Sequence, residues 1–205
     1  ILNAPIVCLI TEGRLTNENF ESGSKNLLAT IKSTFEAGLT YIQIREKRLS
    51  AKNVFHLTSE AVSIARDSPT KILVNDRADI AAAARADGVQ LTEASLSISV
   101  IRSAFPDLIV GVSTHSVSSV ENVAKSGAAF ALFGPVFPTH GKENAQGIDE
   151  LSKACAVAPG FPVLAIGGID ETNYRRVLAA GCAGFAAIRW LNDETHLRFF
   201  RENGS

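Results

Sequence analysis

The sequence predicts an α/β fold, a single (β/α)8 or TIM barrel that spans residues 1–205 as one domain. Three observations predict it: eight short apolar runs, helix-like stretches between them, and a composition that does not break along the chain. The runs are continuously apolar, as is typical of parallel strands buried on both faces. Eight strand–helix units favour one closed barrel. The predicted strands are Ile6–Thr11, Tyr41–Glu46, Lys71–Asp76, Gly88–Leu91, Ile109–Thr114, Phe130–Pro135, Pro162–Gly168 and Gly184–Arg189.

The segments between these runs have the apolar spacing of amphipathic helices. Leu27, Leu28, Ile31 and Phe35 fall on one face of the first segment, and later segments repeat the pattern. A doubly wound open sheet is the alternative fold, although it usually has fewer strands at this length. The longest irregular stretch is 136–147. A loop of that length in a compact domain is usually functional.

Charge narrows the classes of partner. The chain has 20 Lys and Arg residues against 21 Asp and Glu residues, a formal net charge of −1. This balance provides no basic field for nucleic acid or for an anionic membrane surface. No apolar run approaches the roughly 20 residues of a membrane span. We therefore expect a small-molecule substrate, with neither nucleic acid nor a membrane as partner.

The cysteines and the aromatic residues near the C-terminus bear on location and assembly. The three cysteines are odd in number, stand in apolar surroundings and lack metal-ligand spacing, so we interpret them as reduced, mostly buried side chains of a cytoplasmic protein. Trp190, Phe199 and Phe200 suggest an apolar surface that favours a homodimer. The alternative is that these aromatic residues pack the last helix against the barrel.

The last two predicted strands end in residues suited to phosphate binding. The seventh ends in Gly167 and Gly168, and the eighth ends in Ile188 and Arg189. In (β/α)8 barrels the loops after these strands commonly form a phosphate site, and paired glycines let backbone N–H groups approach a ligand. We therefore predict that these residues bind a phosphorylated substrate. The alternative is a Gly-Gly turn that merely ends a buried strand.

Polar residues follow the earlier strands, at the ends where barrel enzymes place their active sites. Cations beside a lone carboxylate suit a polyphosphate whose metal ion is held partly by protein. The candidates are the cations Arg45, Lys47 and Lys142, the carboxylate Asp76, and the neutral side chains Gln43, Asn75, Ser113 and Thr139. If the second strand stays extended, alternation places Gln43, Arg45 and Lys47 on one side.

Several of these residues also have a purely structural interpretation. The run Arg45–Arg48 resembles a solvated stretch of charge, and Asn75 or Asp76 is suited to cap the following helix. His115, after the fifth strand, is suited to general acid/base work near neutral pH. It is equally suited to a structural hydrogen bond. Ser116 beside it is a good helix N-cap residue.

Six segments of the chain match one known family in order and spacing. They are Gln43–Lys47, Val74–Arg77, Ala86–Leu91, Gly111–Ser116, Gly134–Thr139 and Ala165–Ile169. On these segments nearly the whole chain resembles the thiamin phosphate synthase/TenI family, whose fold is a β/α barrel. Thiamin phosphate synthase joins hydroxymethylpyrimidine diphosphate to thiazole phosphate with loss of pyrophosphate, using Mg²⁺.

The resemblance implies roles for individual residues. Asp76 would bind Mg²⁺, Ser113 would contact the departing pyrophosphate, and Thr139 with Gly168 would hold thiazole phosphate. The chemistry is dissociative, so cations that stabilise the leaving group matter more than a strong base. The residues that would hold the pyrimidine diphosphate are Gln43, Arg45, Lys47, Asn75 and Lys142.

The chain departs from the synthase pattern at three positions. Gln90 and Ser95 stand where synthases usually have His and a second metal-binding Asp, and Arg189 replaces a small Ser. Losing one carboxylate weakens a Mg²⁺ site without excluding it. Gln90, Ser95 and the retained His115 are more similar to the TenI branch, which tautomerises a thiazole carboxylate phosphate without metal. Arg189 would add a phosphate contact, point outward, or narrow the pocket.

These observations lead to three hypotheses. The first is a TenI-like thiazole tautomerase without cofactor, in which His115 moves a proton; we assign catalytic roles to His115, Gln43 and Lys47. The second is a Mg²⁺-dependent thiamin phosphate synthase. The third belongs to another class, a non-catalytic protein that binds thiazole phosphate or thiamin phosphate.

Overall fold

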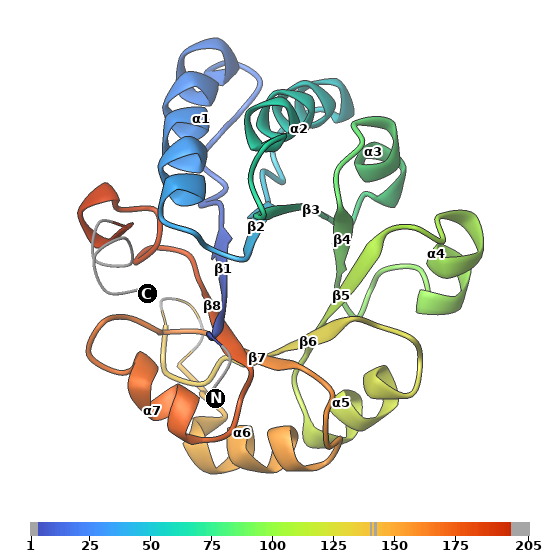
Figure 1. Cartoon of the computed structure of the whole chain (residues 1–205), viewed down its shortest axis with the longest axis vertical. Coiled ribbons are helices and arrows are strands. Elements are labelled where there is room, and N and C mark those ends of the chain that lie inside the picture. Colours follow the sequence, from blue (N-terminus) through green and yellow to red (C-terminus); the bar gives the residue numbers. More distant parts are fainter. Residues whose placement is uncertain (1–3, 140, 142, 198–205) are drawn as a thin grey trace. The chain divides into compact units, whose positions relative to one another are not determined.

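The computed structural model describes residues 4–139, 141 and 143–197 of the chain. Within these residues, eight parallel strands form one closed barrel in the order β1 to β8, and a helix follows each of the first seven (Figure 1). The predicted fold class is therefore confirmed. The strands are β1 Ile6–Ile10, β2 Tyr41–Ile44, β3 Lys71–Asn75, β4 Gly88–Leu91, β5 Ile109–Thr114, β6 Phe130–Phe133, β7 Val163–Ile166 and β8 Gly184–Ala187.

The helices occupy the predicted segments between the strands. They are α1 Phe20–Glu36, α2 Ala51–Ala65, α3 Ala78–Ala83, α4 Ile98–Ala104, α5 Val117–Ala124, α6 Gly147–Ala156 and α7 Tyr174–Ala179. Three of them, α2, α4 and α5, begin with a serine cap. Ser50 Oγ accepts from Asn53 N at the start of α2, and Ser116 Oγ accepts from Ser119 N at the start of α5.

The contacts within the chain divide it into two compact units. We call Cys8–Val89, with the described residues from Ile188 onward, the N-terminal unit. We call Gln90–Ala187, with residues 4–7, the C-terminal unit.

In the N-terminal unit, β2 pairs in parallel with β1 and β3, and α1 and α2 lie side by side (Figure 1). Gln43 of β2 is in register with Ile10 of β1 and with Leu73 of β3. The strands are apolar because both faces are covered. Fully buried side chains of this unit include Leu9, Ile10, Ile31, Ile42, Ile44, Leu57, Ile72 and Leu73.

In the C-terminal unit, β5, β6, β7 and β8 form a continuous parallel ladder. Its core contains the fully buried rings of Phe130, Phe133 and Phe185. Helices α5, α6 and α7 follow one another around the outside of these strands, each packed against the next (Figure 1). The apolar strands therefore hold the loops at their carboxyl ends on a rigid support.

The structure also bears on the aromatic residues near the C-terminus, the cysteines and the question of a membrane span. Trp190 is only 6% exposed, so it contributes no surface to a dimer, and Phe199 and Phe200 lie outside the described residues. All three cysteines are unpaired thiols, and burial raises the pKa of Cys8 to about 12. Among the described residues, no helix has the length and apolar character that a membrane crossing requires.

Candidate functional site

An amide pair at the carboxyl ends of β2 and β3 is the centre of the polar group in the N-terminal unit. Gln43 Nε2 donates to Asn75 Oδ1 at 3.0 Å. Gln43 is 3% exposed, and its Oε1 is buried and accepts no hydrogen bond from any residue that the structure describes. A buried polar atom without a partner is costly, and in a native protein it needs an explanation. Gln43 Oε1 is therefore suited to accept an N–H group from a ligand.

The two cations after β2 lie beyond the end of the strand. Strand β2 ends at Ile44, so it does not stay extended to Lys47, and the condition under which alternation would place Gln43, Arg45 and Lys47 on one side is not met. The backbone leaves the ladder at Arg45, whose N–H donates instead to Thr11 Oγ1 at 2.8 Å. Arg45 is half-buried and Lys47 is exposed in the turn that follows.

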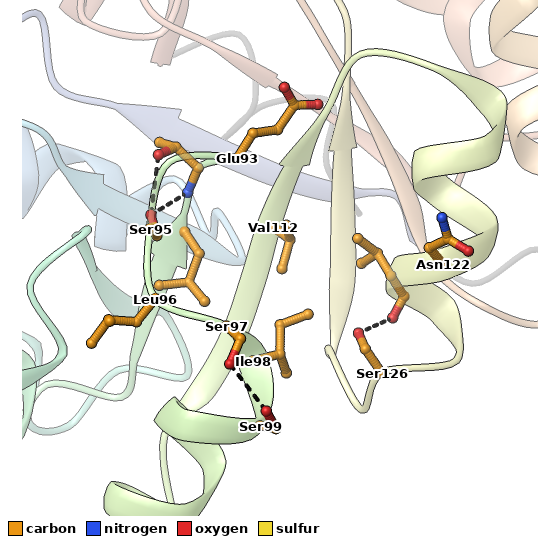
Figure 2. A pocket seen from close by; sticks show the side chains of 12 residues that line it. Glu93, Ser95, Leu96, Ser97, Ile98, Ser99, Val112, Asn122 and Ser126 are labelled. Carbon is orange, nitrogen blue, oxygen red and sulfur yellow. Dashed lines mark hydrogen bonds between the residues drawn. The ribbon is translucent and has the colours of Figure 1, made fainter.

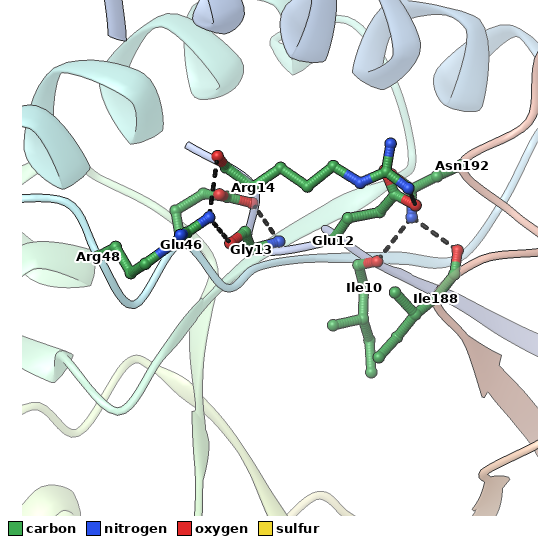
Figure 3. Close-up of polar contacts among 8 residues, drawn as sticks. All are labelled: Ile10, Glu12, Gly13, Arg14, Glu46, Arg48, Ile188 and Asn192. Atoms are coloured by element: carbon green, nitrogen blue, oxygen red, sulfur yellow. Dashed lines mark hydrogen bonds and ion pairs between the residues drawn. The ribbon is translucent and has the colours of Figure 1, made fainter. Parts of the chain in front are cut away.

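The run of charges 45–48 is not a solvated stretch, because one member is buried. Glu46 is 4% exposed, and one of its oxygens accepts the backbone N–H group of Gly13 at 2.9 Å (Figure 3). The other oxygen accepts the backbone N–H group of Leu15, also at 2.9 Å. Sequence reasoning missed this residue. From the sequence, a carboxylate that stands between three cations is expected to form ion pairs with them. Its actual partners, Gly13 and Leu15, are more than 30 positions away in the chain, so the sequence gives no sign of them.

Asp76 follows β3 in an unusual backbone conformation. Its φ is 61°, in the left-handed region, which Asp adopts more readily than most residues. The N-cap of α3 is Arg77, so the alternative in which Asn75 or Asp76 caps this helix is wrong. Asp76 is exposed, while the neighbouring Arg77 pairs with Asp79. The carboxylate of Asp76 is therefore exposed at the end of the strand.

The donor set fits a Mg²⁺ ion that arrives with a phosphorylated substrate. In the described part of the chain, no group of three or more His, Cys, Asp or Glu side chains is arranged so that it could hold a metal ion. Mg²⁺ is usually bound through one or two carboxylates, and substrate phosphates and water complete its octahedron. Asp76 provides one such carboxylate. The residues present therefore suit a substrate-carried Mg²⁺ better than a preformed cage of protein ligands.

In the C-terminal unit, Ser113 and His115 lie at the end of β5. Gln90 Nε2 donates to Ser113 Oγ at 3.2 Å, which leaves the Ser113 hydroxyl proton available for an acceptor such as a phosphate oxygen. His115 Nδ1 is hydrogen-bonded to the carbonyl oxygen of Gly134. Because a carbonyl oxygen only accepts, Nδ1 carries the proton, and Nε2 of the neutral ring is the acceptor. The exposed ring is thus oriented for proton transfer at Nε2.

Ser95, at the position of a missing carboxylate, has a local structural role. Its Oγ accepts from Thr92 N at 2.7 Å and lies 3.1 Å from Thr92 Oγ1, closing the turn before α4. Ser95 lines a cavity of about 420 Å³ between this turn and α5. Figure 2 shows the side chains that surround it. None of the predicted site residues lines that cavity.

The glycine turn after β7 is shaped by close packing. Gly167 and Gly168 have φ values of 101° and 64°, which favour glycine. A Cβ atom on Gly168 would lie 2.8 Å from Phe137 Cβ and 2.8 Å from the Pro138 carbonyl oxygen. The paired glycines are therefore required by the loop after β6, whether or not a ligand is bound. Asn173 braces the same turn, because its Nδ2 donates to Gly168 O at 2.8 Å.

The remaining predicted phosphate-binding residues have mixed outcomes. Thr139 and Ile188 are half-buried and Arg189 is exposed, so Arg189 does not fill an interior position. Asn192, a residue that sequence reasoning missed, donates from Nδ2 to the carbonyl oxygens of Ile10 and Ile188 at 2.8 and 2.7 Å (Figure 3). Lys142 lies outside the described residues.

Comparisons with known proteins agree on one family. A family model described as thiamine monophosphate synthase matches residues 7–191. A protein named putative thiamine-phosphate synthase from Geobacter sulfurreducens is 36% identical over 85% of this chain and 83% of its own length. The thiamine-phosphate synthase of Pyrococcus abyssi is 34% identical over 88% of this chain and 83% of its own length.

A solved structure extends this similarity to three dimensions. The thiamine phosphate pyrophosphorylase from Pyrococcus furiosus superimposes with a TM-score of 0.80 at 31% sequence identity. The match covers 96% of this chain and 95% of that one. Sequence and fold therefore agree over nearly the full length of both chains.

Proposed function

Since the chain belongs to the thiamine monophosphate synthase family, a family of thiamin-biosynthesis enzymes, we propose that it is a thiamin phosphate synthase. It would join hydroxymethylpyrimidine diphosphate to thiazole phosphate and release pyrophosphate. The relatives named above support the synthase over the tautomerase, which the sequence alone slightly favoured. The proposal depends most on the pair of Gln43 and Asn75.

This amide pair matches the chemistry of an aminopyrimidine. The buried Gln43 Oε1 is an acceptor for the pyrimidine amino group, and the Asn75 amide nitrogen is a donor for a ring nitrogen. A site that hydrogen-bonds a substrate in this way strongly rejects analogues that lack the polar group. The pair therefore supports recognition of the pyrimidine by this unit.

The charged residues of the same unit suit the diphosphate. In the reaction, the bond between the pyrimidine methylene carbon and the diphosphate oxygen breaks, and the thiazole nitrogen bonds to that carbon. Negative charge then accumulates on the departing pyrophosphate. Arg45 and Lys47 would stabilise that charge. Mg²⁺ held by Asp76 would neutralise part of the same charge.

The turn after β7 suits the second substrate. Gly167, Gly168 and Thr139 would bind the phosphate of thiazole phosphate. The turn is held open by its positive φ values and by Asn173 rather than by a ligand. Such a site is preformed, so binding does not have to order it.

A thiazole tautomerase is the second candidate function, and one observation favours it. The hydrogen bond from His115 Nδ1 to Gly134 O leaves Nε2 as a proton acceptor in an exposed ring. In that case His115 would carry the chemistry and no metal would be needed. A protein that binds thiazole phosphate without turnover is the third candidate.

One assay with two variants separates the candidates. Purified protein is incubated with both synthase substrates and Mg²⁺, and thiamin phosphate is measured after oxidation to fluorescent thiochrome. We expect catalytic turnover, a decrease of about 10- to 100-fold in kcat/KM for Gln43→Met, and little change for His115→Asn. Gln43→Met preserves length and removes both hydrogen-bonding atoms.

The opposite pattern would contradict the synthase. If no thiamin phosphate forms, proton exchange on the thiazole is measured next. Exchange that is lost in His115→Asn identifies the tautomerase, and binding of thiazole phosphate without exchange identifies the non-catalytic protein. Thermal unfolding of each variant checks that the fold is retained.

A further inference from the structure

A buried carboxylate connects the loop after β1 to the segment after β2. Glu46 lies between Arg45 and Lys47, yet it is 4% exposed. Its Oε1 accepts from Gly13 N at 2.9 Å (Figure 3), and its Oε2 accepts from Leu15 N at the same distance. Burying a carboxylate is costly unless it is hydrogen-bonded, and bonds to an ionised acceptor are stronger than neutral ones. Glu46 therefore holds this turn by both oxygens.

The same turn is held at its carbonyl groups by Arg48. Arg48 Nη2 donates to Gly13 O at 3.3 Å and to Arg14 O at 3.2 Å (Figure 3). The N–H group of Gly13 is thus taken by Glu46 and its carbonyl group by Arg48. We call Glu46 and Arg48 the clamp. The two clamp residues flank Lys47, and Glu46 directly follows Arg45 in the chain.

The clamped turn lies against Arg45. Gly13 has a φ of +75°, and a Cβ atom placed on it would lie 3.8 Å from Arg45 Nη1 and 3.3 Å from the Arg45 carbonyl oxygen. The Arg45 backbone N–H is fixed separately by Thr11 Oγ1 at 2.8 Å. The turn at Gly13 therefore forms a surface against which the Arg45 guanidinium rests.

We propose that Glu46 is a positioning residue that sets the Arg45 guanidinium for binding a diphosphate group. The proposal rests on the proposed function, in which Arg45 contacts the diphosphate of the pyrimidine substrate. Glu46 itself faces backbone N–H groups and does not touch substrate. Its effect passes through Gly13 to Arg45. Geometric errors of about 1 Å in a site are costly to catalysis, which is why a clamp on this turn affects the reaction.

The test compares two clamp variants with an exposed control. In Glu46→Gln, one oxygen still accepts an N–H group, while the amide nitrogen opposes the other. Arg48→Met removes the donors to the carbonyl groups and changes an exposed side chain, so it tests the clamp if Glu46→Gln does not fold. Glu60→Gln, an exposed carboxylate on α2, is the matched control.

Two measurements distinguish positioning from general loss of structure. The first is KM for each substrate of thiamin phosphate formation. The second is the Kd of inorganic pyrophosphate with Mg²⁺, measured by calorimetry without turnover. For Glu46→Gln we expect KM for the pyrimidine diphosphate and Kd for pyrophosphate to rise about tenfold, as for one lost hydrogen bond to a charged group. KM for thiazole phosphate should stay unchanged, Arg48→Met should show a smaller rise in the same quantities, and Glu60→Gln should match the wild type.

The outcomes are separable from those of the proposed function. Equal changes in both KM values, or clamp variants that bind pyrophosphate as the wild type does, overturn the positioning role. A wild-type protein that binds pyrophosphate but makes no thiamin phosphate overturns only the proposed synthase, and the pyrophosphate comparison still decides the role of Glu46. A wild type that does neither overturns both.

Discussion

The two units present their polar groups by different means. In the N-terminal unit, the Gln43 and Asn75 side chains are hydrogen-bonded to each other, and the backbone N–H of Arg45 donates to Thr11 Oγ1. In the C-terminal unit, the turn at Gly167 and Gly168 is a piece of backbone, held by left-handed φ values and by tight packing against the loop after β6. The geometry of the polar groups in the N-terminal unit therefore depends on hydrogen-bond partners, whereas the geometry of the glycine turn in the C-terminal unit depends on the absence of side-chain atoms.

This difference predicts how each unit responds to substitution. A side-chain site loses one interaction at a time, so conservative changes have graded effects. A backbone site tolerates almost no added atom, because any Cβ meets its neighbours and strains the turn. The N-terminal unit should therefore be adjustable by mutation, whereas the glycine turn should be nearly all-or-none.

The largest effect is expected for Gly168→Ala. The new Cβ would lie 2.8 Å from Phe137 Cβ on a residue with a φ of 64°. We expect a loss of about 2–4 kcal/mol in the free energy of unfolding, from strain and steric overlap together. KM for thiazole phosphate should rise at least about tenfold, because the turn must move. Urea unfolding and steady-state kinetics measure the two effects.

Gly160→Ala separates steric overlap from backbone strain. Gly160 has a φ of +81°, and a Cβ there would meet no atom within 4 Å. This control should lose only about 1 kcal/mol, the cost of a left-handed alanine, and should keep its kinetics. Equal destabilisation by the two substitutions would show that packing around Gly168 contributes nothing, and the comparison between the units would fail.

An intermediate effect is expected for Ser95→Asp, which gives the C-terminal unit a side-chain carboxylate where synthases have one. Ser95 Oγ accepts from Thr92 N at 2.7 Å, and an Asp side chain closes the same kind of turn. We expect the Mg²⁺ concentration for half-maximal thiamin phosphate formation to fall about three- to tenfold. A titration of activity with Mg²⁺ measures it.

The matched control for Ser95→Asp adds the same charge two positions away. Ser97 is the exposed N-cap of α4, and Asp is also a favoured cap, so Ser97→Asp should fold normally. Its half-maximal Mg²⁺ concentration should stay close to that of the wild type. If both variants shift it equally, the gain reflects net charge alone, and position 95 has no special relation to the metal.

The sequence predicts the strands well and their partners poorly. The run Ile72-Leu73-Val74 is short, continuously apolar and rich in β-branched residues, which is typical of a buried parallel strand, and it lies in β3. The same reasoning predicts which polar residues stand at the strand ends. It does not predict that Glu46 is buried, because the partners of Glu46, Gly13 and Leu15, are more than 30 positions away. The sequence also does not show why a glycine is required at position 168, because the requirement comes from the packing of Phe137 and Pro138 against it.

The smallest effect is expected where a side-chain contact in the N-terminal unit is exposed rather than buried. Arg77 donates to both oxygens of Asp79 at 2.8 and 2.6 Å, and this hydrogen bonding lowers the pKa of the Asp79 carboxyl. The Asp79 side chain is 60% exposed, so solvent screens the pair, and Asp79→Asn should cost less than about 1 kcal/mol at pH 7.

The lowered pKa of Asp79 predicts how the stabilisation by this pair changes with pH. A carboxyl whose folded pKa is lowered stabilises the fold above its unfolded pKa of about 3.9, and that contribution is lost as pH falls through the lower folded value. Urea unfolding of wild type and Asp79→Asn should therefore differ slightly at pH 7 and converge as pH falls below about 4. A loss at pH 7 as large as that of Gly168→Ala would contradict the comparison, because an exposed ion pair would then matter as much as the packed turn.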